Sequence, residues 1–272
     1  MRIGVVAPSS RFSPEAAERV QALAATRFPQ VELVFHRQCF LTHKHFAGTD
    51  AERAAAFVEY AKDPAFDALW FARGGYGACR FAEDAIAALT PRARDKIYLG
   101  YSDGGYLLAG LYRAGFPRLA HGPMPQDALR DGGEAAVERA LAWLAEGAAE
   151  SLEPGLEQGA LHAAFNITVF GLLLGTPLEP DLTGHVLLLE DVAEHMYRTD
   201  RAMFHITANP AVRRIAGIRL GRCSDVPAND PDFGETEEEV VRFWCRRSGI
   251  RWLGRAEIGH EVENKVVPLG RL

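Results

Sequence analysis

The chain has 272 residues, which is enough for one large α/β domain or for two smaller ones. Apolar residues make up 48% and charged residues 24% of the sequence, a composition that is typical of a folded globular protein and unlike that of a disordered one. The formal net charge of −6 provides no general electrostatic reason to bind nucleic acid or anionic lipid. We therefore predict neither a nucleic-acid partner nor a membrane partner.

The N-terminal sequence runs directly into a strand-like segment, without the apolar stretch and cleavage site of a signal peptide. No apolar run reaches the roughly 20 residues that are needed to cross a bilayer. These features predict a cytoplasmic protein. The cysteines have no C-x-x-C spacing, and we expect free thiols and no zinc site. They are Cys39, Cys79, Cys223 and Cys245.

Strand-like and helix-like segments alternate through the first half of the chain. Apolar runs predict strands over 2–7, 31–36, 68–72 and 97–100 and from Leu119 onward, and helical spacing predicts helices over 14–28, 50–61 and 80–89. This alternation favours a parallel sheet with helices on its faces. Ligands of such sheets bind at the carboxyl ends of the strands, so the loops that follow the strands are the expected place for chemistry.

The stretch Gly100-Tyr101-Ser102-Asp103-Gly104 follows one of these strands and matches the pattern G-x-S-x-G. Such a pattern is typical of an abrupt strand-to-helix turn that lifts a nucleophilic serine clear of the sheet. The free N–H groups of the following helix would point toward an anion formed there. The alternative is a glycine-rich loop with an incidental serine, and this stretch alone does not decide between the two.

Two further loops follow predicted strands. Arg73-Gly74-Gly75-Tyr76-Gly77 has three glycines, which allow backbone N–H groups to approach a ligand closely and to act as oxyanion donors. Arg73 is suited to bind a carboxylate, or alternatively pairs with a surface acid. His121, in the loop after the strand that starts at Leu119, is either a base or, more commonly for such a position, a pocket-lining residue.

The composition changes between residues 145 and 163, where no periodicity is evident and Pro154-Gly155 punctuates the chain. We predict a domain from 1 to 147, a linker from 148 to 163 and a second domain from 164 to 272. In the second half we expect strands at 186–190, 215–220 and 252–258 and helices at 200–206, with Asp200 as the N-terminal cap, and at 235–246, whose first turn is acidic.

A nucleophilic serine needs a base, and that base needs an acid that fixes its tautomer. Glu190 ends an otherwise apolar strand, and a carboxylate there is costly to bury without a partner. Any of the nine histidines could be the base, and His260 is the one that follows the last predicted strand. Ser102, Glu190 and His260 therefore form a candidate triad, in one of the chain orders that such triads adopt.

Motifs along nearly the whole chain resemble the LD-carboxypeptidase family of serine peptidases, the S66 family. They are Arg73-Gly74-Gly75-Tyr76-Gly77, Gly100-Tyr101-Ser102-Asp103, His121-Gly122-Pro123-Met124, Gly175-Thr176-Pro177, Leu189-Glu190-Asp191-Val192, Tyr197-Arg198-Thr199-Asp200-Arg201, Gly259-His260, Asn264, Pro268 and Gly270. The resemblance implies that Ser102 is the nucleophile, His260 the base and Glu190 the acid. It also implies an N-terminal, flavodoxin-like or glutamine-amidotransferase-like parallel-sheet domain that carries the serine. A smaller mixed α/β domain would carry the acid and base, with the site at the junction.

The activity implied by the resemblance is removal of the terminal D-alanine from murein tetrapeptides during cytoplasmic peptidoglycan recycling, by a homodimer without metal or other cofactor. We expect the backbone N–H groups of Asp103 and Gly75 to form the oxyanion hole. Four residues are predicted to contact the substrate: Arg73, Gly74, Tyr76 and His121. The alternatives are hydrolysis of a peptidyl-nucleotide antibiotic by the same triad and non-catalytic binding of muropeptides.

Two departures from the family pattern lie near the acid. Ala164-Phe165-Asn166 stands where family members often have G-G-N, and Ala193-Glu194-His195-Met196-Tyr197 stands where they often have G-E-P-P-Y. These departures bear on the substrate preference more than on the triad chemistry.

Overall fold

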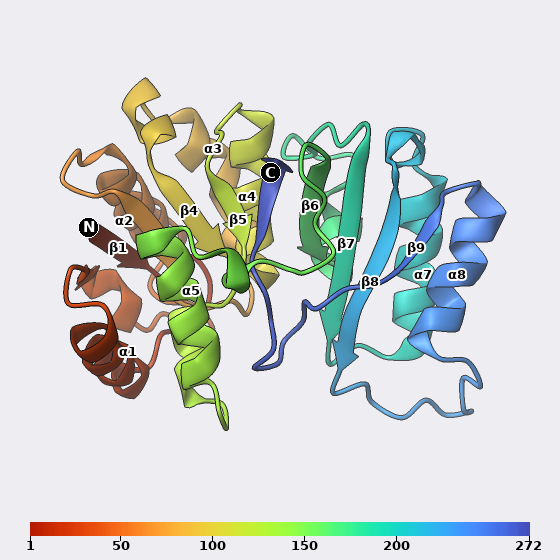
Figure 1. Ribbon diagram of the computed structural model, residues 1–272, viewed down its shortest axis with the longest axis horizontal. Helices are drawn as coiled ribbons and strands as arrows, with labels where there is room; N and C mark the ends of the chain where they lie inside the picture. Colours follow the sequence, from red (N-terminus) through yellow and green to blue (C-terminus); the bar gives the residue numbers. More distant parts are fainter.

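The computed structural model describes all 272 residues and has a single sheet of ten strands in the order β2-β1-β3-β4-β5-β10-β6-β7-β8-β9 (Figure 1). All neighbouring strands are parallel except at β10, which runs antiparallel to both β5 and β6. The strands are β1 Arg2–Val6, β2 Glu32–Phe35, β3 Ala68–Phe71, β4 Ile97–Gly100, β5 Leu119–His121, β6 Leu161–Asn166, β7 His185–Val192, β8 Gly217–Ser224, β9 Trp252–Arg255 and β10 Val267–Arg271. This confirms the α/β class with a mostly parallel sheet.

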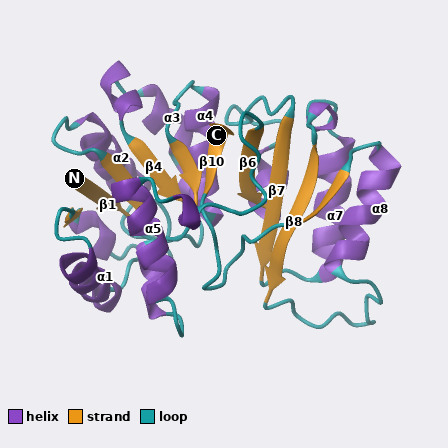
Figure 2. Ribbon diagram, viewed as in Figure 1, coloured by secondary structure: helices purple, strands orange, loops and turns teal.

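Helices cover both faces of the N-terminal half of the sheet (Figure 2). The helices are α1 Pro14–Arg27, α2 Asp50–Lys62, α3 Ala82–Ala87, α4 Gly105–Arg113, α5 Glu134–Glu146, α6 Ile167–Leu173, α7 Met196–Ala208 and α8 Glu237–Ser248. One core contains α1 and α5, and the larger core contains the other six helices. Consecutive residues of β3 point to opposite faces of the sheet, as in any strand. Trp70 therefore packs in the core that contains α1 and α5, and Phe71 packs in the larger core.

The C-terminal half of the sheet has helices on one face only. The other face is covered by a small core that Leu156, from the predicted linker, and Ile258, from the segment before β10, share with Ala164 and Leu188. These two segments cross in front of the strands in Figure 1. The chain thus returns from β9 along the sheet and ends at β10, between the strands of the two halves.

Local sequence signals explain where two of the surface helices begin. Thr49 and Glu52 form a capping box at the start of α2, and Thr236 and Glu239 form another at the start of α8. Glu237, Glu238 and Glu239 form the acidic first turn that was predicted for this helix, whereas Glu235, where the helix was predicted to begin, precedes the cap. None of the helices is long and apolar enough to span a membrane.

The structure corrects several predicted elements. Asp200 is not a cap, because α7 begins earlier, at Met196, and the Asp200 carboxylate instead accepts a hydrogen bond of 2.7 Å from the Trp244 indole. Strand β6 starts at Leu161, inside the segment predicted to be a linker. Strand β10 was not predicted at all. The predicted helix at 80–89 is shorter, because a 3-10 turn over Ala78–Arg80 precedes α3.

The segment predicted to be a linker is tied to the second half by a buried ion pair. The Glu153 carboxylate has no exposed surface and pairs with the Arg219 guanidinium of β8 through two contacts of 2.5 and 2.8 Å. The N–H groups of Gly155 and Glu257 donate to the same carboxylate. The division into two domains with a linker stays a prediction.

Replacing Glu153 by alanine is expected to lower the free energy of unfolding by about 3–5 kcal/mol, because it leaves a largely buried guanidinium without its partner. Urea titration followed by circular dichroism measures the change. The matched control is Glu15→Ala, which removes an exposed carboxylate that also pairs with an arginine. There the expected loss is below about 1 kcal/mol. Equal losses in the two variants would contradict the assignment of the Glu153 pair as an anchor.

Candidate active site

Ser102 lies on an abrupt turn at the carboxyl end of β4. The strand ends at Gly100, a 3-10 turn spans Ser102–Gly104, and α4 begins at Gly105. Ser102 has a φ of +56°, in the left-handed region that an L-residue adopts only with strain. A Cβ at Gly100 would lie 2.5 Å from the Phe71 ring, so the close packing of the strand end requires glycine. The local structure therefore has the form of a nucleophile turn.

The same turn faces the second half of the chain. A Cβ built on Gly105, the first residue of α4, would lie 3.2 Å from Val169 and 3.4 Å from Phe165. Val169 belongs to α6, and Phe165 belongs to β6. Ser102 is therefore presented where elements of the two halves pack against each other.

Glu190 and His260 form a buried pair. The Glu190 side chain has no exposed surface, and its Oε2 lies 2.7 Å from Nδ1 of His260, a residue that is 7% exposed. Burial by itself lowers the pKa of His260, but the charge and hydrogen bond of Glu190 outweigh it and raise this pKa above its ordinary value. Burial likewise raises the pKa of Glu190, and the His260 charge and hydrogen bond outweigh it and lower that pKa. The carboxylate thus holds the histidine through Nδ1 and leaves Nε2 as the atom available for proton transfer.

A tight turn presents His260. Gly259 donates its N–H to Oδ1 of Asn264 at 3.2 Å, and the Asn264 N–H donates to the carbonyl of Glu261. The turn leads into β10, which enters the sheet antiparallel to β5 and β6. The amino end of β10 therefore lies at the same edge as the carboxyl ends of the parallel strands, and this brings His260 to the edge that carries Ser102 and Glu190.

A second set of contacts joins the Ser102 turn to His260. The Tyr101 ring lies 4.7 Å from the His260 ring, centroid to centroid, and the Tyr101 hydroxyl donates to Asp127 at 2.8 Å. Asp127 also accepts from Arg130 at 3.1 Å, and Arg130 donates to the backbone carbonyl of His260. Ser102 and His260 form no hydrogen bond in this structure, so the three residues as a working triad stay a prediction.

The glycine loop after β3 packs directly on the Ser102 turn. A Cβ at Gly74 would lie 2.7 Å from Oγ of Ser102, and a Cβ at Gly75, where φ is +109°, would lie 2.1 Å from Oγ of Ser10. The buried Asp103 carboxylate accepts the Ser9 hydroxyl and the N–H of Ala78. At Gly74 the backbone of this loop thus lies next to Ser102. The role of the Gly75 N–H as an oxyanion donor stays a prediction.

Substituting Gly75 by alanine is expected to reduce kcat by about 10²-fold, the effect of losing one oxyanion donor, because a side chain cannot adopt this φ beside Ser10 without moving the loop. Steady-state kinetics on the peptide substrate measures the effect. The control is Gly254→Ala in β9, where φ is +93° and nothing lies within 4 Å of the new Cβ. An unchanged kcat in Gly75→Ala would exclude this part of the loop from catalysis.

The residues predicted to bind substrate lie in three different environments. Arg73 and Tyr76 are exposed, and Arg73 donates to the carbonyl of Arg11 at 3.1 Å. Gly74 is buried against Ser102. His121 is only 1% exposed, neither ring nitrogen has a hydrogen-bond partner, and burial lowers its pKa to about 4, so the ring is neutral at neutral pH. The roles of these four residues in substrate binding stay predictions. No three His, Cys, Asp or Glu side chains are grouped so that they could hold a metal ion.

Sequence reasoning missed the residues that connect the parts of the site. Tyr101 stands inside the quoted G-Y-S-D motif, yet its hydroxyl contact with Asp127 joins segments 26 residues apart. Asp127 lies in a 3-10 turn and Arg130 directly follows it, in a stretch whose composition carries no catalytic signal. The contact of Arg53, in α2, with the glycine loop could not be predicted from the sequence either, because Arg53 has the position of an ordinary charged residue in an amphipathic helix.

A serine on a strained turn and a buried carboxylate–histidine pair thus lie at the junction of the two halves of one sheet. Residues 3–122 match the family model described as the LD-carboxypeptidase N-terminal domain, and residues 159–272 match the one described as the C-terminal domain. The chain is 32% identical to the protein named "Putative carboxypeptidase" of Synechocystis sp., over 99% of this chain and 89% of that protein. The chain belongs to the LD-carboxypeptidase family, and it is a serine-type carboxypeptidase, as its motifs predicted.

A more distant relative and two solved structures are also similar to this chain. Identity to the murein tetrapeptide carboxypeptidase of Pseudomonas aeruginosa is 25%, over 99% of this chain and 91% of that protein. The crystal structure of muramoyltetrapeptide carboxypeptidase from Oxalobacter formigenes superposes with a TM-score of 0.81 at 22% identity, covering 99% and 93% of the two chains. The microcin C7 self immunity protein MccF in complex with aspartyl sulfamoyl adenosine gives 0.78 at 20% identity, covering 99% and 91%. The two solved structures have the same fold as this chain.

Proposed function

We propose that the protein is a serine carboxypeptidase that hydrolyses the L,D-peptide bond before the terminal D-alanine of murein tetrapeptides, with Ser102, His260 and Glu190 as its catalytic residues. The observation that carries this proposal is the 2.7 Å contact between Glu190 and His260 beside the strained Ser102 turn. Catalytic hydrogen bonds are often formed only when substrate is bound, so the missing Ser102–His260 bond is compatible with the role.

In the proposed mechanism Nε2 of His260 accepts the Ser102 proton while Oγ attacks the scissile carbonyl. Glu190 remains ionised and stabilises the imidazolium that forms. The backbone N–H groups of Asp103 and of the glycine loop, at Gly75, would bind the developing oxyanion. His260 then gives its proton to the amine of the leaving D-alanine. In the second step His260 accepts a proton from a water molecule, which attacks the acyl group on Ser102, and His260 returns the proton to Oγ of Ser102 as the acyl group is released.

The substrate class is taken from relatives whose names state it. The protein of Pseudomonas aeruginosa is named for murein tetrapeptide, and a relative in Bacillus subtilis, 27% identical over 98% of this chain and 86% of that protein, has a name that refers to murein peptide. A carboxypeptidase also needs a cation for the free carboxylate of its substrate. Arg73 is our candidate, because it is the exposed first residue of the glycine loop and its guanidinium suits two-point binding of a carboxylate.

A second candidate function uses the same residues on a peptidyl-nucleotide antibiotic. The observation that favours it is the fold shared with the microcin self immunity protein, whose bound ligand is an aminoacyl sulfamoyl nucleoside. A third possibility, a binder of muropeptides without catalysis, is disfavoured because binding alone does not need a buried carboxylate paired with a histidine beside a strained serine.

One assay separates these functions. The protein is incubated with murein tetrapeptide, with murein pentapeptide and with a peptidyl-adenylate analogue, and free D-alanine and free nucleotide are measured. Release of D-alanine from the tetrapeptide supports the proposed function. Turnover of the adenylate analogue alone would favour the second function, and no turnover of any compound would favour the third.

We also propose that the protein acts as a homodimer in the cytoplasm, as the family resemblance implies. The outer faces of α6, α7 and α8 expose large apolar side chains, which is the kind of surface that a partner subunit covers. They are Leu172, Tyr197, Phe204 and Phe243, with exposed fractions of 66, 45, 53 and 43%. Sedimentation velocity at micromolar concentration distinguishes a monomer from a dimer.

A further inference from the structure

Arg53 on α2 is a charged residue that the proposed mechanism leaves unexplained. Its side chain has no exposed surface, and it is among the largest fully buried side chains of the protein. A buried guanidinium is costly unless hydrogen bonds and an opposite charge compensate it. Its partners therefore indicate what its burial achieves.

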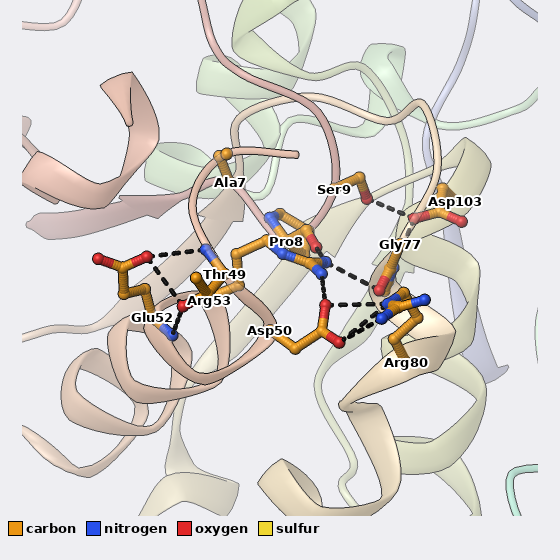
Figure 3. Close-up of polar contacts among 12 residues, drawn as sticks. Ala7, Pro8, Ser9, Thr49, Asp50, Glu52, Arg53, Gly77, Arg80 and Asp103 are labelled. Atoms are coloured by element: carbon orange, nitrogen blue, oxygen red, sulfur yellow. Dashed lines mark hydrogen bonds and ion pairs between the residues drawn. The ribbon is translucent and has the colours of Figure 1, made fainter. Parts of the chain in front are cut away.

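The partners of Arg53 are two backbone carbonyls and one carboxylate (Figure 3). Its Nη1 donates to the carbonyls of Pro8 at 2.6 Å and Gly77 at 2.8 Å, and its Nη2 pairs with Asp50. The guanidinium also lies 4.6 Å from the centroid of the Phe46 ring. One nitrogen thus binds two different loops while the other is held by the carboxylate.

Those two loops are the ones that surround the Ser102 turn. Pro8 follows β1, and Gly77 ends the glycine loop that follows β3. The Asp103 carboxylate, next to Ser102, binds the neighbouring residues of the same loops, through the Ser9 hydroxyl and the Ala78 N–H. Arg53 and Asp103 therefore hold the same pair of loops at adjacent points, as Figure 3 shows.

The glycine loop lies on Arg53 without any gap. A Cβ at Gly77 would be 2.7 Å from Nη1 of Arg53, and three residues earlier a Cβ at Gly74 would be 2.7 Å from Oγ of Ser102. The loop is thus confined between the guanidinium at one end and the serine at the other. A movement of the loop at Gly77 would change the position of the N–H groups near Ser102.

We propose that Arg53 is a positioning residue, which fixes the glycine loop 73–77 and the Pro8 loop against the Ser102 turn and so sets the position of the oxyanion donors. This inference rests on the proposed function, since it assumes that Ser102 is the nucleophile. Arginine is required because its planar fork serves two carbonyls and a carboxylate in fixed directions, whereas a lysine ammonium is a compact point charge.

The test compares three variants, Arg53→Gln, Arg53→Lys and Arg80→Gln. Arg80 is the matched control, because it also pairs with Asp50, at 2.9 and 3.0 Å, but it donates to no backbone carbonyl of either loop. The first readout is the rate at which a fluorophosphonate probe labels Ser102, with Ser102→Ala as the unlabelled reference. The second is kcat and KM on the tetrapeptide, and thermal melts show the temperature range in which each variant is folded.

We expect Arg53→Gln to label about 10²-fold more slowly than the unsubstituted protein, the size of effect that loss of an oxyanion donor produces. Its kcat should fall similarly while KM changes less than about threefold, because uniform substrate binding is retained. Arg53→Lys should recover about tenfold of the lost rate, and Arg80→Gln should stay within about threefold of the unsubstituted protein.

Equal labelling rates in folded Arg53→Gln and Arg80→Gln would overturn the proposal. A decrease in the labelling rate of Arg53→Gln that is fully accounted for by its unfolded fraction would also overturn it. If Arg53→Gln does not fold, Arg53→Lys decides, since labelling of that variant at the unsubstituted rate is incompatible with a positioning role. Absence of labelling in the unsubstituted protein would instead contradict the proposed function. The two failures are therefore distinguishable.

Discussion

Replacing Ser102 by alanine is expected to lower kcat for release of D-alanine from the tetrapeptide by about 10⁶-fold, the size of loss seen when the nucleophile of a triad is removed. The physical reason is that Oγ of Ser102 is the atom that bonds to the substrate carbonyl, so the covalent route is lost and only the oxyanion donors and substrate binding remain. Quantification of free D-alanine over long incubation measures the residual rate. Substrate binding, measured by calorimetry, should persist.

The matched control for Ser102→Ala is Ser102→Gly, which removes the same hydroxyl but also relieves the backbone strain. Because φ at Ser102 is +56°, alanine retains a left-handed conformation that costs an L-residue roughly 1–2 kcal/mol. Glycine adopts it freely but has more entropy to lose on folding, by about 0.5–1 kcal/mol. We expect both variants to be inactive and Ser102→Gly to be the more stable of the two. Full activity in either variant would remove Ser102 from the mechanism.

The strained turn itself could be predicted from sequence because its signal is local. A short apolar strand, a serine flanked by glycines and a helical leucine pattern all occur within residues 97–111, and the structure has a strand, a 3-10 turn and a helix there. The strand that carries Glu190 was predicted for a similar reason, since a run of apolar residues with one terminal carboxylate is visible in a window of a few residues. The predicted end at Glu190 was wrong, because β7 continues to Val192.

The parts that could not be predicted depend on contacts between distant segments. Strand β10 contains Pro268 and Gly270, which weaken a strand signal, and it is stabilised by pairing on both sides with β5 and β6. The burial of Arg53 depends on carbonyls that lie 45 and 24 residues away, at Pro8 and Gly77. From the sequence, an arginine among alanines in an amphipathic helix is expected to be solvated, because the neighbouring residues carry no information about loops that are distant in the chain.

The pairing of Glu190 with His260 predicts a specific dependence of activity on pH. The base must be neutral to accept the Ser102 proton, so kcat/KM should fall as pH decreases through the pKa of His260. Although burial acts to lower that pKa, the charge and hydrogen bond of Glu190 raise it above its ordinary value of 6.5. The midpoint of the acidic limb of the pH profile is therefore expected above pH 6.5.

In Glu190→Gln the plateau of kcat/KM should fall by about 10⁴-fold, because an amide can donate to Nδ1 and favour the wrong tautomer of the histidine. The acidic limb of the pH profile should also move toward lower pH, a shift that a general loss of activity would not produce. The carboxylate that raised the pKa of His260 is gone, and burial, which lowers it, remains. A pH profile of kcat/KM between pH 4 and pH 9, measured for both proteins, tests the two effects separately.

The adjacent carboxylate provides the control for this shift. Asp191 is also buried, and burial raises its pKa to about 6, so its own titration falls within the measured range. It binds Asn166 at 2.7 Å and the Thr168 hydroxyl at 2.9 Å, and it forms no hydrogen bond or ion pair with His260. Asp191→Asn should therefore keep the acidic limb above pH 6.5, whereas a shift to lower pH as large as that of Glu190→Gln would mean that general negative charge, and not the Glu190 hydrogen bond, sets the pKa of the base.

The Glu190–His260 pair also makes the free energy of unfolding depend on pH, and this dependence should differ between the unsubstituted protein and Glu190→Gln. His260 has a raised pKa in the folded state, so its contribution to stability is present below pH 6.5 and is lost as pH rises through the folded pKa. Glu190 has a lowered pKa, so its contribution is present above its ordinary pKa of 4.5 and is lost as pH falls through the folded value. The unsubstituted protein should thus exceed Glu190→Gln in free energy of unfolding most between those two limits, near pH 5–6. The difference should shrink toward alkaline pH, where His260 is neutral and able to act as the base. The pH at which the pair stabilises the fold most is therefore below the pH at which it is most active.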